Sequence, residues 1–273
     1  MKTPIKAHFT ILLLFIASIC YSQQVDTVSV YSKKMDLHIK NVVILPKDYD
    51  FNKEYPVLYL LHGYGGNHTS WINLKPTLPQ EATKYNIIIV CPDGKNSWYL
   101  DSPINPKSQY ETYVSKELVN YIDSAYCTRK NPKGRAITGL SMGGHGGLWL
   151  GISHQDIFGA CGSTSGGVDI RPFPNNWEMK KTLGKYNENT QTWEKHTVTN
   201  LISKINSDSL SIILDCGTED VFYKVNEELH KKFLDNNIKH DYIIRPGGHN
   251  REYWNNSIDY QLLYFSKIFN QYE

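Results

Sequence analysis

The sequence feature that most constrains the fold is a short glycine-rich segment centred on Ser141. An apolar, strand-like run at residues 136–138 leads into Gly-Leu-Ser-Met-Gly (139–143), and small residues then begin a helix. A Gly-x-Ser-x-Gly pattern between a strand and a helix is typical of a sharp turn that exposes its serine above a sheet. The same five residue types also occur in ordinary glycine-rich turns. The strand before them and the helix after them favour the exposed-serine turn here.

Apolar runs and helical patterns alternate along the rest of the chain. Residues 56–61, 87–91 and 211–216 are mostly apolar runs of the kind found in strands that are covered on both faces. Residues 113–125 instead repeat apolar side chains at helical spacing. Residues 25–46 alternate in polarity and predict two antiparallel strands at a sheet edge. We therefore expect an α/β fold in one domain, with a mostly parallel central sheet and helices on both faces.

The first 22 residues have the layout of a secretory signal peptide. Two lysines precede an apolar run at residues 9–19, and polar residues follow soon after. This run is too short for a transmembrane span. Ile19 does not fit the small residue that lipoprotein processing requires before Cys20, so we expect no lipid anchor. Residues 23–273 should form the mature domain, which would be secreted or periplasmic.

The balance of charged residues limits the kinds of partner that the chain is expected to bind. The 29 Lys and Arg residues nearly balance the 27 Asp and Glu residues, which argues against nucleic acid or an anionic membrane surface as partner. We expect a small-molecule or neutral polymer partner instead.

No Cys-x-x-Cys or His-Glu-x-x-His spacing supports a metal site. Three of the mature cysteines lie in apolar runs typical of buried thiols, and the sequence leaves their pairing open. The mature cysteines are Cys91, Cys127, Cys161 and Cys216.

A second glycine-rich segment follows the apolar run at 56–61. It starts at His62 and continues through Gly-Tyr-Gly-Gly (63–66), without the spacing of a phosphate-binding or dinucleotide-binding loop. In a serine hydrolase such a loop provides one backbone N–H of the oxyanion hole. We predict the amides of Tyr64 and Met142 as the two donors, with a plain surface turn as the alternative. His62 is expected to hold the loop in place through hydrogen bonds.

A serine hydroxyl needs a base, and that base needs a carboxylate to orient it. In the expected fold the acid and the histidine follow the serine in that order, on loops after late strands. Asp220 lies 79 residues after Ser141, and His249 lies 29 residues further on. Each follows a predicted strand, at the edge where active-site groups gather. His240 is a rival base, but it precedes its strand and so lies at the opposite edge.

Three carboxylates compete for the role of the acid. Asp215 is still within the predicted strand, where its direction depends on register, and Glu219 and Asp220 follow a Gly-Thr turn. We choose Asp220 because the turn leaves it room to reach across to the base. His145 lies on the helix after the serine, where packing is the expected role.

Aromatic residues near the predicted site are candidate substrate contacts. Trp98 and Tyr99 lie in a loop-like segment, where they either line the site or pack the loop down. Residues 166–200 interrupt the alternation of strand and helix, and we expect them to form an insertion over the carboxyl edge of the sheet. This insertion, a lid or a pocket wall, contains Trp177 and Trp193. We predict Trp98, Tyr99 and Trp177 as substrate-binding residues.

Taken together, these motifs resemble the esterase D-like branch of the α/β hydrolases. That branch holds feruloyl and acetylxylan esterases, S-formylglutathione hydrolases and mycolyl transferases. The resemblance covers nearly the whole mature chain. It implies Ser141 as nucleophile, Asp220 as acid, His249 as base and the amides of Tyr64 and Met142 as oxyanion hole, with no metal or organic cofactor. The matching segments are 59–63 with Trp71, 92–94, 139–144, 216–220 and 247–249 with Trp254.

The predicted function is that of a secreted serine esterase working through an acyl-enzyme. Its expected substrates are acyl or feruloyl esters on carbohydrate, because secretion disfavours the formylglutathione role. A general short-chain carboxylesterase is the main alternative. A peptidase activity is also compatible with these three residues, since ester and amide cleavage share this machinery. A non-catalytic carbohydrate-binding protein would be expected to have lost a member of the triad, and none is lost.

Overall fold

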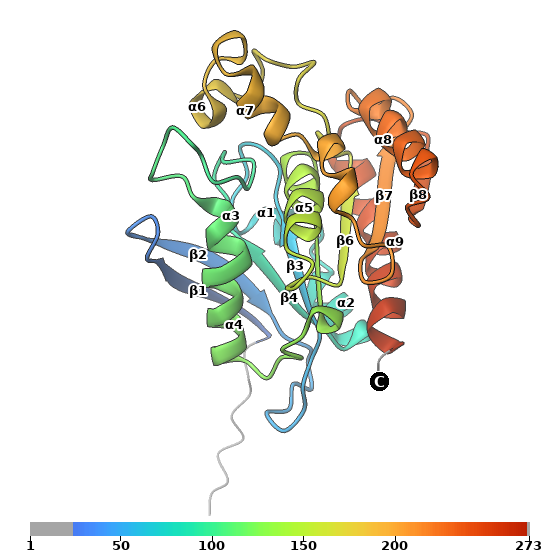
Figure 1. Ribbon diagram of the computed structural model, residues 1–273. Helices are drawn as coiled ribbons and strands as arrows, with labels where there is room; N and C mark the ends of the chain where they lie inside the picture. Colours follow the sequence, from blue (N-terminus) through green and yellow to red (C-terminus); the bar gives the residue numbers. More distant parts are fainter. Residues whose placement is uncertain (1–23, 272–273) are drawn as a thin grey trace, which may run out of the picture.

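The computed structural model describes residues 24–271, which form a layered α/β structure around an eight-stranded sheet of order β1-β2-β4-β3-β5-β6-β7-β8 (Figure 1). The predicted signal peptide lies outside the described residues. The strands are β1 (Val25–Ser32), β2 (Leu37–Ile44), β3 (Val57–Leu61), β4 (Ile88–Pro92), β5 (Arg135–Gly139), β6 (Ala160–Thr164), β7 (Ser211–Gly217) and β8 (Asp241–Arg245).

The sheet is mostly parallel, as predicted. β1 pairs with β2, and β2 with β4, in antiparallel register, whereas every pairing from β4 through β3, β5, β6 and β7 to β8 is parallel. The two predicted antiparallel edge strands are therefore confirmed. Parallel pairing brings the carboxyl ends of β3, β5, β7 and β8 to one edge of the sheet, so the loops that follow these strands can meet.

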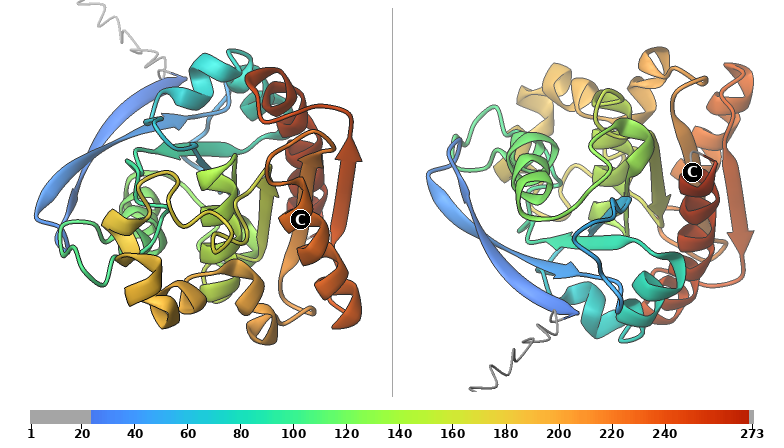
Figure 2. Two further views of the ribbon diagram at one scale, coloured as in Figure 1. Left: turned by 90° about the horizontal axis from the view of Figure 1, so that it is seen from above. Right: turned by 90° about the horizontal axis from the view of Figure 1, so that it is seen from below.

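Helices cover both faces of the sheet (Figure 2). The longer helices are α2 (Leu78–Tyr85), α4 (Val119–Ala125), α5 (Met142–Ser153), α8 (Tyr223–Asp235) and α9 (Arg251–Asn270). Short helices are α1 (Ser70–Leu74), α3 (Tyr110–Thr112), α6 (Lys180–Leu183) and α7 (Thr190–Lys195), with a π-helical turn at Tyr113–Leu118 and 3-10 turns at Pro132–Gly134, Tyr186–Glu188, Val198–Asn200 and Ile202–Lys204.

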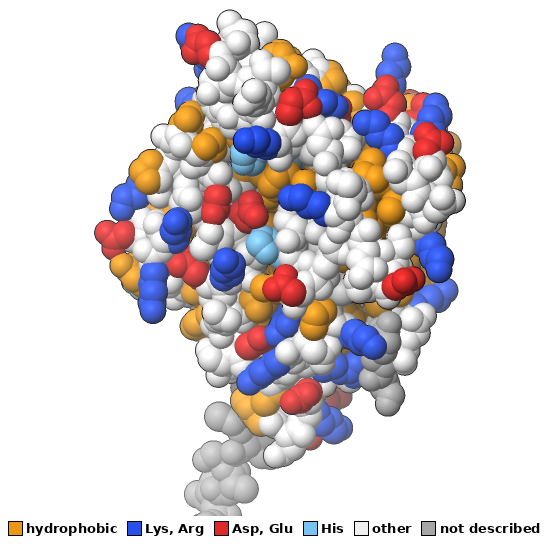
Figure 3. Space-filling view, in the orientation of Figure 1, with side chains coloured by type: hydrophobic (Ala, Val, Ile, Leu, Met, Phe, Trp, Pro, Cys, Tyr) orange, Lys and Arg blue, Asp and Glu red, His pale blue; other side chains and the backbone are white. Residues whose placement is uncertain are grey.

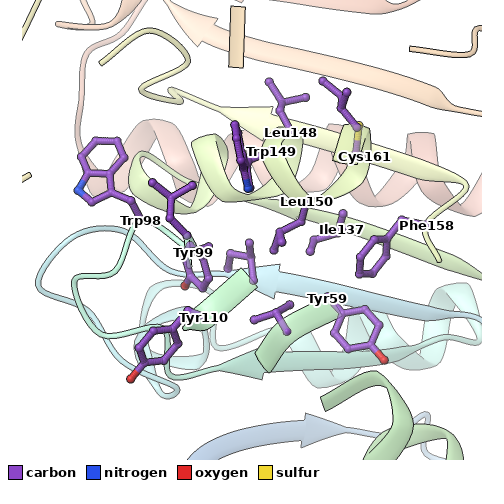
Figure 4. Packing of buried hydrophobic residues seen from close by; sticks show 14 of the residues in the cluster. Tyr59, Trp98, Tyr99, Tyr110, Ile137, Leu148, Trp149, Leu150, Phe158 and Cys161 are labelled. Atoms are coloured by element: carbon purple, nitrogen blue, oxygen red, sulfur yellow. The ribbon is translucent and has the colours of Figure 1, made fainter. Parts of the chain in front are cut away.

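Alternate residues of β3 pack into two separate hydrophobic cores. Leu58 and Leu60 of β3 pack with side chains from α1, α2 and α9. Tyr59 and Leu61 point to the other face, toward side chains of α4, α5 and α8. Figure 4 shows Tyr59 among the buried residues of this second core. Burial on both faces explains why the strand lacks the polar alternation of an edge strand.

The segment at 166–200 lies above the carboxyl edge of the sheet, with α6 and α7 at the top of Figure 1. Two hydrogen bonds join it to loops that follow β3 and β4. The Tyr64 hydroxyl donates to the Glu178 carboxylate at 3.2 Å, and Ser102 Oγ donates to the carbonyl of Thr182 at 2.6 Å. These contacts place the segment beside the loops that follow the central strands.

The cysteines are unpaired in the described part of the chain. Cys91, Cys161 and Cys216 are buried, as their apolar context predicted, and Cys127 is half-buried. Burial raises the pKa of each of the three buried thiols well above its ordinary value. These thiols are therefore protonated and unreactive at neutral pH.

Candidate active site

The turn at Ser141 has the backbone of a strained elbow. Ser141 follows β5 directly and precedes α5, with φ 55° and ψ −116°. The helix begins so close to β3 that side chains do not fit at the flanking glycines. A Cβ on Gly143 would lie 2.3 Å from the carbonyl oxygen of Leu61, and one on Gly139 would lie 2.4 Å from the same atom. Glycine is thus required at both positions, and the strain at Ser141 is held by its surroundings.

Three side chains from separate loops meet at this elbow. His249 Nε2 lies 2.9 Å from Ser141 Oγ, and His249 Nδ1 lies 3.0 Å from each carboxylate oxygen of Asp220. Because an ionised carboxylate only accepts hydrogen bonds, Nδ1 carries the proton and Nε2 is left to accept one from the serine hydroxyl. Ser141 follows β5, Asp220 follows β7 and His249 follows β8.

The surroundings hold the acid and the base in place. The Asp220 side chain is fully buried, and its Oδ1 accepts the backbone N–H of Phe222 at 2.8 Å. The rings of Phe222 and Trp254 pack edge-on against the His249 imidazole, with centroid separations of 5.3 and 4.9 Å. A quarter of the His249 side chain stays exposed, so the imidazole can exchange protons with a ligand or water.

The rival acids are held elsewhere. Asp215 accepts hydrogen bonds from Tyr253 Oη and, at 2.7 Å, from Arg245. Burial raises the pKa of the Asp215 carboxyl. Glu219 is exposed. Among the candidate acids, the structure brings only Asp220 to the histidine.

The rival histidines also have other partners. His240 Nε2 lies 2.7 Å from His230 Nδ1, away from the elbow. His145 is buried on α5, with Nδ1 3.1 Å from the carbonyl oxygen of Trp98. Neither is placed to take a proton from Ser141.

The loop after β3 is fixed by His62, as the sequence predicted. His62 Nε2 accepts the N–H of Gly94 at 2.9 Å, so Nδ1 carries the proton and donates it to the carbonyl of Gly63 at 2.7 Å. Within residues 24–271, neither the amide of Tyr64 nor that of Met142 has a hydrogen-bond acceptor. Both amides are therefore free to donate to a ligand.

A cleft of about 410 Å³ opens beside Ser141. Trp177 from the 166–200 segment lies on its wall, as do His249 and two residues that the sequence analysis had not assigned to substrate binding, Arg251 and Trp254. Both lie only a few residues after His249 in the sequence, at the start of α9. This proximity to the predicted base was the sequence signal that could have placed them beside the serine. The other residues lining the cleft are Gly63, Tyr64, Gly65, Gly66, Ser70, Leu74, Leu140 and Ser141.

The prediction that Trp98 and Tyr99 contact a ligand needs correction. They are only 1% and 0% exposed and do not line the cleft. The Tyr99 hydroxyl accepts the backbone N–H of His62 at 3.0 Å, and the Trp98 ring packs against Trp177 with a centroid separation of 5.8 Å. Their aromatic rings support the cleft from beneath because the tight loop that carries them folds inward. Trp193 is likewise buried.

His145 makes the folded chain sensitive to acid. Burial lowers the pKa of this histidine from 6.5 to about 4. Below pH 6.5 the His145 side chain binds a proton in the unfolded chain but not in the folded chain. The free energy of unfolding therefore has its full value above pH 6.5 and decreases as the pH falls toward 4. We expect His145 to remove roughly 3 kcal/mol of unfolding free energy across this window.

Urea denaturation between pH 4 and pH 7 measures this effect. His145→Gln should show a shallower fall in stability across the window than the wild type. His38→Gln is the control, because His38 is exposed, and its curve should parallel the wild type. Equal slopes for the wild type and His145→Gln would contradict the assignment.

Three further features concern the kinds of ligand and surface that the described residues offer. Within the described residues, no three His, Cys, Asp or Glu side chains are grouped so that they could hold a metal ion. None of the helices in that part of the chain is long and apolar enough to cross a membrane. Lys and Arg are interspersed with Asp and Glu on the face shown in Figure 3. That face has no extended surface of one charge that would favour a polyanion.

Comparison with known proteins yields consistent matches. The family model named Esterase matches residues 32–265. An acetyl esterase from Caldicellulosiruptor saccharolyticus is 25% identical over 262 residues, which cover 88% of this chain and 97% of that protein. A solved ferulic acid esterase is 27% identical, with a TM-score of 0.77 over 90% of this chain and 98% of that one.

A third similarity concerns the fold alone. FphF, a fluorophosphonate-binding serine hydrolase from Staphylococcus aureus, has a TM-score of 0.79 at 20% identity. The alignment covers 89% of this chain and 98% of that one. With the parallel sheet and its helices on both faces, these similarities confirm the predicted α/β-hydrolase fold.

Proposed function

The chain belongs to the esterase family, and from this premise we propose that it is a serine esterase with Ser141 as nucleophile, His249 as base and Asp220 as acid. One observation carries the proposal. A single imidazole bridges the elbow hydroxyl and a buried carboxylate, at 2.9 Å and 3.0 Å. This is the arrangement that activates a serine hydroxyl at neutral pH.

The proposed reaction has two halves. Ser141 Oγ attacks the ester carbonyl carbon while His249 Nε2 takes the hydroxyl proton, and the amides of Tyr64 and Met142 donate to the oxyanion. His249 then gives its proton to the leaving alcohol, and an acyl-enzyme remains. In the second half His249 removes a proton from water, which attacks the acyl group. Collapse of the second oxyanion releases the carboxylic acid and restores Ser141.

For substrate we propose acyl or feruloyl esters carried on carbohydrate. The names of two similar proteins, an acetyl esterase and a ferulic acid esterase, support this class. Trp177 and Trp254 on the wall of the cleft support it further, because flat aromatic side chains suit an aromatic acid or a sugar face. The predicted signal peptide, which would place the enzyme outside the cytoplasm beside polysaccharides, belongs to the same proposal. The alternative is a general short-chain carboxylesterase, which the small volume of the cleft also suits.

A substrate series tests the proposal. Purified protein is assayed on acetylxylan, on feruloylated arabinoxylan and on nitrophenyl esters from acetate to octanoate. We expect release of acetate or ferulate from at least one polysaccharide, together with hydrolysis of the shorter nitrophenyl esters. Hydrolysis of nitrophenyl esters alone would support the short-chain carboxylesterase. A folded protein that cleaves none of them would contradict esterase activity and favour a peptidase or a binding protein.

A further inference from the structure

A second hollow adjoins the cleft at the start of α9. We call it the α9 hollow; its volume is about 820 Å³, twice that of the cleft. It contains none of the three groups that meet at the elbow. Leu74 and Arg251 line both spaces, so the two lie side by side with these residues between them. A ligand long enough to pass over these two residues can place one part beside Ser141 and another part in the α9 hollow.

The wall of the α9 hollow is held by a buried ion pair at the edge of the sheet, where β8 and α9 lie side by side (Figure 2). Arg245 donates to Asp215 at 2.7 Å, and the Asp215 side chain is completely buried. The guanidinium carbon of Arg245 lies 4.4 Å from the centre of the Tyr260 ring and 4.9 Å from that of Tyr253. A wall fixed in this way loses little entropy when a ligand binds.

Three asparagines of the α9 hollow each keep part of their hydrogen-bonding capacity. Asn250 Oδ1 accepts an N–H in the first turn of α9, Asn255 Nδ2 donates to the carbonyl of Leu74 and Asn256 Oδ1 accepts from Arg245. The other end of each amide has no partner in the part of the chain that the structure describes. Two amide NH₂ groups and one amide oxygen are thus left to bind a ligand. Hydroxyl groups satisfy this mixture because each can both donate and accept a hydrogen bond.

The charges around the α9 hollow are balanced. Asp259 pairs with Lys75 at 2.7 Å, and Arg245 pairs with Asp215. Arg251 and Glu252 contribute one charge of each sign. No net field therefore selects an anion or a cation, which argues for an uncharged ligand.

Tyr260 adds an apolar surface beside these polar groups. The residue is 44% exposed and lines the α9 hollow. The Arg245 guanidinium covers one face of the ring, and the hollow that the ring lines also contains the amide donors and acceptors. An aromatic ring in such a hollow complements a sugar, which has an apolar face and hydroxyl groups around its edge.

We propose that the α9 hollow is a subsite for an uncharged glycan chain whose ester group lies at Ser141. This inference rests on the proposed function, because the ester must be carried by carbohydrate. The cleft would then hold the acyl group and its nearest sugar, and the α9 hollow would hold sugars further along the chain.

Direct binding of ester-free glycans tests the subsite separately from catalysis. Titration calorimetry of the wild type with xylohexaose, cellohexaose and mannohexaose should detect binding of at least one of them. Tyr260→Ala should weaken that binding about tenfold or more. The matched control is Leu263→Ala, which removes an apolar side chain of similar exposure, 45%, from the same helix outside the hollow. Leu263→Ala, which lines neither the cleft nor the hollow, should hydrolyse nitrophenyl acetate at the wild-type rate.

The outcomes separate the two proposals. If nitrophenyl acetate is hydrolysed but no hexaose binds, the subsite is wrong and the esterase stands. Equal hexaose affinities for Tyr260→Ala and Leu263→Ala would also overturn the subsite. If the folded wild type hydrolyses no ester, the proposed function fails, and the subsite as stated here fails with it.

Discussion

Ser141→Ala is expected to lower kcat for ester hydrolysis by about a thousandfold or more. The substitution removes the only hydroxyl placed 2.9 Å from His249 Nε2 among the described residues. Without it no acyl-enzyme can form, although the two amides and the cleft remain to bind substrate. KM should change far less than kcat. Rates of nitrophenyl acetate hydrolysis, together with labelling by a fluorophosphonate probe, measure the loss.

A matched control is available on α5, the helix that follows Ser141. Ser153 ends α5, and its buried hydroxyl has no hydrogen-bond partner among the described residues. Ser153→Ala should keep the wild-type rate and the wild-type labelling. Activity of Ser141→Ala within tenfold of the wild type would show that another group is the nucleophile.

Asp220→Asn is expected to lower kcat by roughly ten-thousandfold. The asparagine can present its amide N–H to His249 Nδ1, and the imidazole would then carry its proton on Nε2. In that tautomer Nε2 cannot accept the proton of Ser141. The packing around position 220 should change little because the two side chains have nearly the same shape, so thermal unfolding should stay close to that of the wild type.

The neighbouring carboxylate provides the comparison for this variant. Glu219→Gln removes a charge one residue away, on a side chain that is exposed, and should leave kcat within a fewfold of the wild type. Parallel pH–rate profiles of the two variants distinguish loss of the orienting acid from a general change in charge. Similar rates for both variants would reject Asp220 as the acid.

Several features of this protein follow from local sequence. The elbow was predictable because Gly139 and Gly143 flank the serine where no side chain fits, a requirement written directly into residue type. The apolar runs predicted the buried strands, since a strand covered on both faces has no polar alternation. The order of serine, acid and histidine then followed from the α/β topology, which brings the carboxyl ends of parallel strands to one edge.

Other features depend on register and packing, which the sequence does not state. Asp215 and Asp220 carry the same carboxyl group, so residue type alone does not distinguish them. Only the positions of β7 and β8 direct Asp215 toward Arg245 and Asp220 toward His249.

The roles of the aromatic residues also depended on tertiary structure. Trp98 and Tyr99 were expected at the surface of the cleft, but the core beneath the loop had room for both rings and buried them.

The sequence by itself therefore determined the fold class, the elbow and the residues able to form the triad. These depend on the backbone freedom of glycine and on the alternation of apolar runs, which are properties of short segments. Only the tertiary structure decided which side chains line the cleft, including Arg251 and Trp254, and that the α9 hollow lies beside it. The reason is physical: a cleft is the space left between segments distant in sequence, so its walls depend on how those segments pack.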